Sequence, residues 1–187
     1  MEERFRPLAP EEMTPEQRRA LDAILSGPRG RIEGPFKALL RSPDLADRVQ
    51  RVGEYVRFRS SMPARLNELA ILVTARKWTA QFEWWAHRRL AMQAGLKSEI
   101  ADAIAKGERP PGMDADEAAV HDFAHALVHT GHPSDAAFAA LRERFGEQGV
   151  IDVVGACGYY TLVSFVLNVD RVGLPEGEAP PLAPLGR

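Results

Sequence analysis

The chain has 187 residues, with 24 Lys and Arg against 26 Asp and Glu and a formal net charge of -2. This balance, with no basic block, argues against a dedicated nucleic-acid surface, which needs clustered cations to displace counterions. Cys157 is the single cysteine of the sequence. It excludes an intrachain disulfide, a four-cysteine zinc site and a dithiol redox motif.

Signals for export or membrane insertion are weak. Residues 1–6 mix acidic and basic side chains and lead into no apolar run, so we expect no secretory signal and a cytoplasmic protein. The uncharged stretch 153–169 contains polar residues and is shorter than the ~20 apolar residues that a membrane span needs. We expect a buried helix there and no membrane association.

Helix signals fill the first half of the chain. Thr14, Pro15 and Gln17 form a capping-box pattern that predicts a helix to about residue 25, followed by a loop rich in Gly and Pro up to residue 35. Further helices are predicted from Ser42-Pro43, from Pro63 and over 78–94. The helix from Ser42-Pro43 is expected to bury an apolar face of Leu45, Val49, Val52, Val56 and Phe58.

The second half continues in the same way. Helices are predicted over 98–106, over 114–130 with an acidic capping box, from Ser134 onward, and over about 147–169. No window alternates long enough for a convincing strand, so we predict an all-α fold of about eight helices. The chain divides into an N-terminal helix and loop (1–34), a main domain (35–172) and a Pro-rich tail (173–187) that should be extended and mobile.

The helix predicted over 78–94 carries the most informative side chains. Five residues at helical spacing share one side: Ala80, Glu83, Trp84, His87 and Ala91. Glu83 and His87 are one turn apart, so a carboxylate can fix the imidazole tautomer and make a general acid or base. Glu68, among apolar residues of the preceding helix, would point to the same place. The alternative is a pair that is solvated or satisfied without any catalytic role.

Neighbouring aromatic and basic side chains have two interpretations each. Trp84 and Trp85 are either core or interface aromatics or a platform for a substrate. Arg88 or Arg89 would bind a carboxylated substrate, since a guanidinium matches a carboxylate in bidentate fashion, or would only solvate the surface.

Four of the five histidines lie within residues 121–132. His121 and His125 are one turn apart, a common arrangement for metal ligands on a helix. His129 would lie about 12 Å further along the axis than His121, which is too far to share one ion. We therefore predict no metal site, with His121 and His125 as weak candidates, and interpret the cluster as an exposed helix face.

Several segments together resemble the carboxymuconolactone decarboxylase family, which shares its fold with the alkylhydroperoxidase AhpD. The resemblance rests on residues 65–76, 82–87, 94–96 and 158–163 and covers roughly 35–172. It implies an AhpD-like all-α bundle that forms a homo-oligomer, commonly a trimer or hexamer.

The AhpD branch uses a Glu, a Cys-x-x-Cys pair and a His. At the same spacing this chain has Glu68, Ala80, Glu83 and His87, so the outer acid and base are present and both cysteines are replaced. Dithiol peroxidase chemistry is not expected, because it passes through a thiolate and a resolving thiol. Cys157 lies among apolar neighbours, where a thiol is usually inert.

The decarboxylase branch is the better match, through its Glu-Trp-x-x-His motif at Glu83, Trp84 and His87. It implies a lyase without cofactors that removes carbon dioxide from a small carboxylated lactone in aromatic catabolism. His87 would be the acid or base, with Glu68 and Glu83 orienting it, and Arg65 or Arg88 would contact the anion.

Two alternatives remain open at this point. One is an antioxidant activity of the peroxiredoxin type without the dithiol, and the other is a non-catalytic member that binds a small molecule. The segment 1–35 would cap the pocket of its own or a neighbouring subunit.

Overall fold

The computed structural model describes residues 2–28 and 30–184. This part of the chain contains eight α-helices, one short 3-10 helix and no β-strand, so the predicted all-α class is confirmed. The helices, after the 3-10 turn at Pro10–Glu12, are α1 (Pro15–Ser26), α2 (Pro35–Leu39), α3 (Pro43–Phe58), α4 (Ala64–Lys77), α5 (Gln81–Gln93), α6 (Ser98–Lys106), α7 (Ala115–Thr130) and α8 (Asp135–Asp170).

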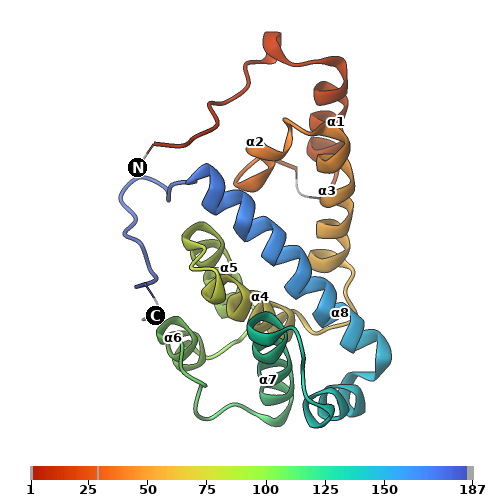
Figure 1. Cartoon of the computed structure of the whole chain (residues 1–187), viewed down its shortest axis with the longest axis vertical. Coiled ribbons are helices and arrows are strands. Elements are labelled where there is room, and N and C mark those ends of the chain that lie inside the picture. The colour runs from red at the N-terminus through yellow and green to blue at the C-terminus, as the bar shows by residue number, and fades with distance from the viewer. Residues whose placement is uncertain (1, 29, 185–187) are drawn as a thin grey trace.

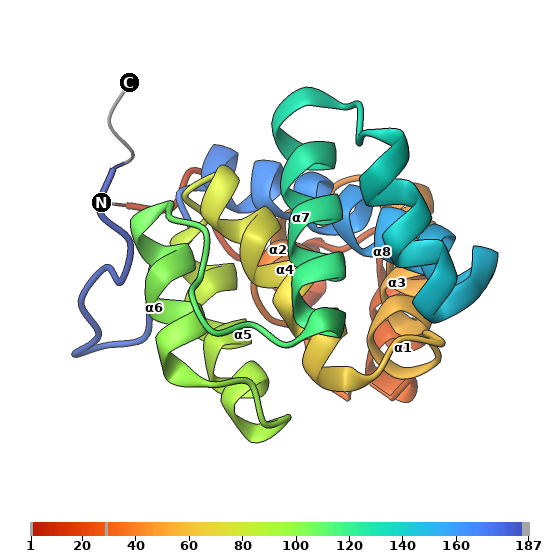
Figure 2. The same cartoon turned by 90° about the horizontal axis from the view of Figure 1, so that it is seen from below.

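Helix α8 organises the molecule. It crosses the structure diagonally, with α1 to α3 on one side and α4 to α7 on the other (Figure 1), and it contacts α2, α3, α4 and α7. Seen from below, α7 lies in front of α4 (Figure 2). One hydrophobic cluster is built mainly from α4 to α8 and a second from α1 to α3 with α8. The candidate site described below lies where these two halves meet.

The predicted helix starts are confirmed by their caps. The Thr14 side chain accepts from the Gln17 N–H at 3.3 Å while the Gln17 side chain accepts from the Thr14 N–H at 2.9 Å. Asp114 and Glu117 make the same reciprocal pair, with both bonds at 2.8 Å. These bonds satisfy N–H groups that a helix start otherwise leaves without partners.

Two elements differ from the prediction, and one predicted break is confirmed. Helix α5 begins at Gln81 rather than residue 78, because Trp78 ends α4 and Thr79 adopts a φ of 48° that no helix continues through. The two helices predicted from Ser134 and from about residue 147 are confirmed: they lie on either side of Gly146, whose φ of 68° and ψ of -177° are not helical, within the range labelled α8. Helix α2 was not predicted, since five residues are too few to show a helical period.

The apolar face predicted for α3 is half wrong. Val49 and Val56 are buried, but Leu45, Val52 and Phe58 are exposed. The buried stripe instead includes Ala46 and Gly53. Small residues are needed there because α8 packs close: a Cβ at Gly53 would lie 2.2 Å from the hydroxyl of Tyr159.

The described part of the C-terminal tail contacts the rest of the molecule at Leu182. Gln81 donates to the carbonyl of Leu182 at 2.7 Å and accepts from its N–H at 3.0 Å. The Leu182 side chain is buried in the cluster of α4 to α8. The proline content of the tail predicted an extended chain, but it could not predict that Gln81 would bind this chain at Leu182.

Helix α8 is the one helix of the described chain that is long and apolar enough to cross a membrane by length and composition. Its most apolar window has a mean hydropathy of 1.8, and 56% of that window is buried inside the molecule. A core helix packed by its neighbours passes the same test, so this is weak evidence for a span. The buried residues of α8 include Val153, Tyr160 and Leu167, as the expectation of a buried helix requires.

Candidate functional site

His87 lies between two carboxylates. Its Nδ1 is 2.7 Å from Glu68 Oε2, and its Nε2 is 4.0 Å from Glu83 Oε2. All three side chains are largely buried, with exposed fractions of 5% for His87, 12% for Glu68 and 8% for Glu83. The structure thus brings together the three residues that the sequence pattern placed at one point.

The local sequence explains this arrangement. Helix α4 packs along α5, and Glu68 is the residue of α4 that meets His87. The five residues predicted to share one side are all buried: Ala80, which directly precedes α5, and Glu83, Trp84, His87 and Ala91 on α5. Because the side chains one turn apart on a helix lie above one another, burying this side places the Glu83 carboxylate beside the His87 ring.

The ring of His87 forms part of the wall of a cavity of about 470 Å³, which we call the α5 cavity. Its walls come from the loop before α2, the end of α3, most of α5 and the middle of α8. The charged and aromatic side chains of its lining include Arg31, Glu33, Arg57, Phe58, Phe82, Glu83, Trp85, His87, Arg89 and Tyr160. Residues from the first 35 therefore help to close the cavity of their own chain, one of the two options considered for this segment.

The cavity is rich in cations and aromatic rings. The guanidinium of Arg57 lies 5.1 Å from the centre of the Phe58 ring, and that of Arg89 lies 5.4 Å from the Trp85 ring. Within the described residues, neither arginine forms a salt bridge, whereas Arg31 pairs with Glu33 at 3.0 Å. An anionic ligand would find two guanidinium groups available.

The hydrogen-bond geometry favours one tautomer of His87. A carboxylate at 2.7 Å from Nδ1 is satisfied by an N–H on that atom, which leaves Nε2 as the acceptor in the neutral ring. The 4.0 Å separation from Glu83 is too long for a hydrogen bond, so Nε2 remains open to a bound molecule. The site can accept or donate a proton at Nε2, which is what a general acid or base requires.

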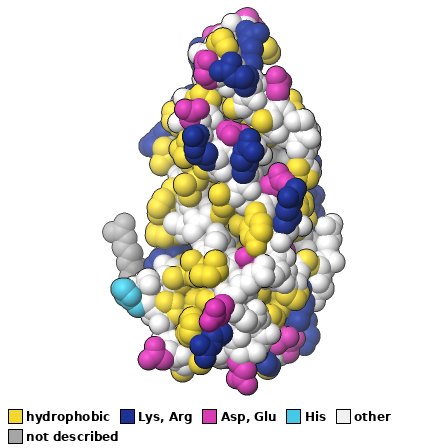
Figure 3. Space-filling view, turned by 90° about the vertical axis from the view of Figure 1, so that its right-hand side faces the viewer, with side chains coloured by type: hydrophobic (Ala, Val, Ile, Leu, Met, Phe, Trp, Pro, Cys, Tyr) yellow, Lys and Arg dark blue, Asp and Glu magenta, His cyan; other side chains and the backbone are white. Residues whose placement is uncertain are grey.

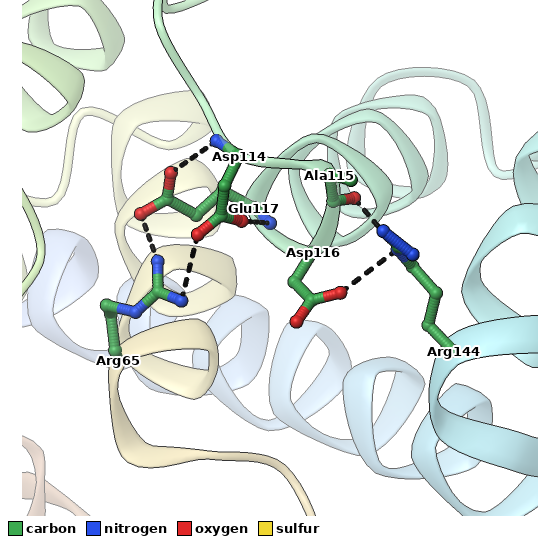
Figure 4. A network of polar contacts seen from close by, with 6 residues as sticks. All are labelled: Arg65, Asp114, Ala115, Asp116, Glu117 and Arg144. Atoms are coloured by element: carbon green, nitrogen blue, oxygen red, sulfur yellow. Dashed lines mark hydrogen bonds and ion pairs between the residues drawn. The ribbon is translucent and has the colours of Figure 1, made fainter.

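Arg65 lies away from the α5 cavity. Its guanidinium forms ion pairs with Glu117 and, at 3.2 Å, with Asp114 at the start of α7 (Figure 4). Arg144 makes a neighbouring pair with Asp116 at 3.0 Å and donates to the carbonyl of Ala115. The structure therefore gives Arg65 a role in joining α4 to α7, in place of the anion contact expected from the sequence.

Two other predicted contacts also lie elsewhere. Arg88 points to α6, where it pairs with Asp102 at 2.7 Å on the surface. Trp84 is 1% exposed and belongs to the hydrophobic cluster of α4 to α8. The next residue in the sequence lines the cavity in each case: Trp85 in place of Trp84, and Arg89 in place of Arg88.

The histidine cluster on α7 forms a stack. The ring centres of His121 and His125 are 5.7 Å apart, and those of His125 and His129 are 4.0 Å apart. His121 is buried and bonded to Asp122, while His125 and His129 are exposed. Residues 2–28 and 30–184 contain no group of three His, Cys, Asp or Glu side chains placed to hold a metal ion.

Cys157 is fully enclosed near Thr74. Burial raises the pKa of its thiol to about 11, although a hydrogen bond with Thr74 acts in the opposite direction. The thiol is therefore protonated at neutral pH, and the nucleophilic thiolate is absent. This environment gives no support to thiol-based peroxide chemistry at Cys157.

Sequence reasoning missed Arg57 and Tyr160 as members of the site. They belong to α3 and α8, and the packing of these helices brings both side chains to the cavity that His87 also lines. The sequence marks Tyr160 only as a polar-tipped residue of the uncharged stretch 153–169, which does not show what it contacts. Arg57, at the end of an amphipathic helix, has no comparable signal.

Comparison with known proteins does not assign the chain to a family. No protein family model matches the sequence, and no curated protein matches it either.

Proposed function

We propose that this protein is a cofactor-independent carbon-carbon lyase of the carboxymuconolactone decarboxylase type, with an AhpD-like bundle, that acts on a small carboxylated lactone. The observation that carries the proposal is the position of His87. Its ring is buried between two carboxylates, one 2.7 Å from Nδ1, and it faces a cavity of about 470 Å³ that also contains cations. Such a volume suits a small organic acid.

The proposed reaction needs one proton donor. When the carbon-carbon bond to the carboxylate breaks, carbon dioxide leaves and the bonding electron pair stays on the substrate, spread into the lactone carbonyl as an enolate. Protonated His87 gives its Nε2 proton to the carbanionic carbon, and solvent returns a proton to the ring. Glu68 stabilises the protonated ring through Nδ1.

Two arginines of the cavity would bind the substrate. Arg57 and Arg89, which form no salt bridge within the described residues, are suited to the carboxylates of the substrate. Among the described residues no carboxylate pairs with either guanidinium, so a ligand carboxylate would not have to displace one of these. Trp85 and Phe82, with ring centres 5.9 Å apart, give the lactone ring an apolar surface.

Release of labelled carbon dioxide from carboxymuconolactone labelled in its carboxyl groups tests the proposal. The wild-type protein should release it above the uncatalysed rate. His87→Ala should lose roughly 100-fold or more, the range for removing a general acid, and Glu68→Gln should lose less because it keeps a partner for the ring. His125→Ala, an exposed histidine of α7, is the matched control. Equal rates for wild type and His87→Ala would refute the assignment.

We further propose that the protein is a homo-oligomer. Exposed apolar residues continue along the outer side of α8: Ile151, Val154, Leu162, Phe165 and Val169. Hydrophobic side chains also lie in patches between charged ones on the side of the molecule seen in Figure 3. Large exposed apolar patches commonly mark interaction sites. A monomer at micromolar concentration by light scattering would contradict this proposal.

A further inference from the structure

The ring of Tyr160 packs edge-on against His87. The two ring centres are 4.7 Å apart and the planes cross at 78°. Tyr160 belongs to α8, is 1% exposed and forms part of the wall of the α5 cavity. Its hydroxyl is buried and has no hydrogen-bond partner within the described residues. The ring that carries this hydroxyl therefore lies against the residue that is proposed to move the proton.

An unpaired buried hydroxyl destabilises a folded protein, because it gives up water without gaining a partner. Phenylalanine would fill the same space without this cost. Tyr55 shows the ordinary situation in the same chain, since its hydroxyl donates to Asp152 at 2.9 Å. The hydroxyl of Tyr160 thus serves the unliganded protein poorly, which points to a partner that arrives with a ligand.

The surroundings keep Tyr160 in its donor form. Burial raises its pKa well above the ordinary value, and the nearby carboxylate of Glu83 raises it further, while Arg57 acts in the opposite direction. The proton therefore stays on the phenol at neutral pH. A protonated phenol donates its single hydrogen bond most strongly to an anionic oxygen.

We propose that the Tyr160 hydroxyl donates a hydrogen bond to the substrate oxygen on which negative charge develops. This inference rests on the proposed lyase function. As carbon dioxide leaves, the electron pair moves toward the lactone carbonyl oxygen, and the Tyr160 O–H binds that oxygen while His87 protonates the carbon. The phenol keeps its proton throughout, so His87 remains the sole proton donor. Tyr160 contacts the substrate directly and acts as an oxyanion donor.

The test compares two tyrosine-to-phenylalanine variants in two measurements. Tyr160→Phe should leave the melting temperature of the unliganded protein unchanged or higher, because the hydroxyl makes no hydrogen bond with the part of the chain that the structure describes. It should lower kcat for carboxymuconolactone by roughly 100-fold, as loss of one oxyanion donor does, with a much smaller change in KM. Tyr55→Phe should show the reverse, with a melting temperature lower by about 2–4 °C and unchanged kcat, because it loses a hydrogen bond outside the cavity.

Failure of this inference can be separated from failure of the lyase proposal. A lower melting temperature for Tyr160→Phe would overturn the inference, since the hydroxyl would then have a structural partner in the resting protein. Normal kcat for Tyr160→Phe in an active protein would also overturn it and leave the lyase proposal intact. A wild-type protein that releases no carbon dioxide would refute the lyase proposal, and with it the assignment of the hydroxyl to an enolate.

Discussion

Replacement of Arg65 by methionine should destabilise the protein without impairing the α5 cavity. Glu117, the partner of Arg65, is 2% exposed, so its carboxylate has almost no access to water. Methionine keeps much of the length of the arginine side chain and removes the charge. Glu117 would then be a buried acid without its cation, although it would still accept the N–H of Asp114 at 2.8 Å.

The expected loss follows from these contacts. Breaking a buried ion pair by removing one partner costs about 3–5 kcal/mol. Arg65 keeps 26% of its side chain exposed, and Glu117 retains one hydrogen bond, so we expect a smaller loss of roughly 2–3 kcal/mol. For a chain of this size each kcal/mol corresponds to about 2–4 °C. The melting temperature should therefore fall by roughly 4–12 °C.

Urea unfolding at neutral pH measures this loss, with Arg88→Met as the matched control. Arg88 forms its ion pair with Asp102 at the surface, where both side chains are 40% or more exposed, so its loss should cost less than about 1 kcal/mol. Equal destabilisation by the two variants would refute the reasoning. So would an Arg65→Met protein of normal stability whose KM for a carboxylated lactone is raised, since Arg65 would then be a substrate contact.

Three further predictions concern acid stability, packing and assembly. Burial alone would raise the pKa of Asp152, but hydrogen bonds from Ser61 and its neighbours outweigh this effect and lower the pKa. The stability that results is present above the pKa of the unfolded chain and is lost as the pH falls below about 4. Asp152→Asn should therefore reduce the dependence on pH, in this acid range, of the free energy of unfolding measured in urea. Gly53→Ala should lower the free energy of unfolding by about 1–3 kcal/mol through overpacking, whereas Gly155→Ala, where an added Cβ meets nothing within 4 Å, should gain up to about 1 kcal/mol; equal signs would contradict the packing argument. Ile151→Lys should reduce the particle mass measured by light scattering, and an unchanged mass would remove this residue from the proposed interface.

Local signals predicted most of the helices. The capping boxes at Thr14 and Asp114 and the apolar spacing of α5 depend on residues within one or two turns, so they can be read without knowledge of the tertiary packing. The meeting of Glu68 with His87 could also be predicted, because a lone carboxylate among buried residues of α4 needs a partner.

Which side of each central helix faces the core, and which faces the cavity, could not be predicted in the same way. Almost every residue of α4 from Leu66 to Arg76 is buried, so this helix has no polar side that marks its orientation. Trp84 and Trp85 have the same composition signal, and the packing of α4 against α5 decides that one enters the core and the other the cavity. Long-range packing likewise brings Tyr160 to His87, and spacing along the chain contains no record of it.

In the proposed reaction, His87 acts as the proton donor of a decarboxylation. Carbon dioxide release from carboxymuconolactone, measured for wild type, His87→Ala and His125→Ala at equal protein concentration, tests it most directly. We predict catalysed release by wild type and His125→Ala and a loss of roughly 100-fold or more for a folded His87→Ala protein. Release by His87→Ala at the wild-type rate, or no release above background by the wild-type protein, would contradict it.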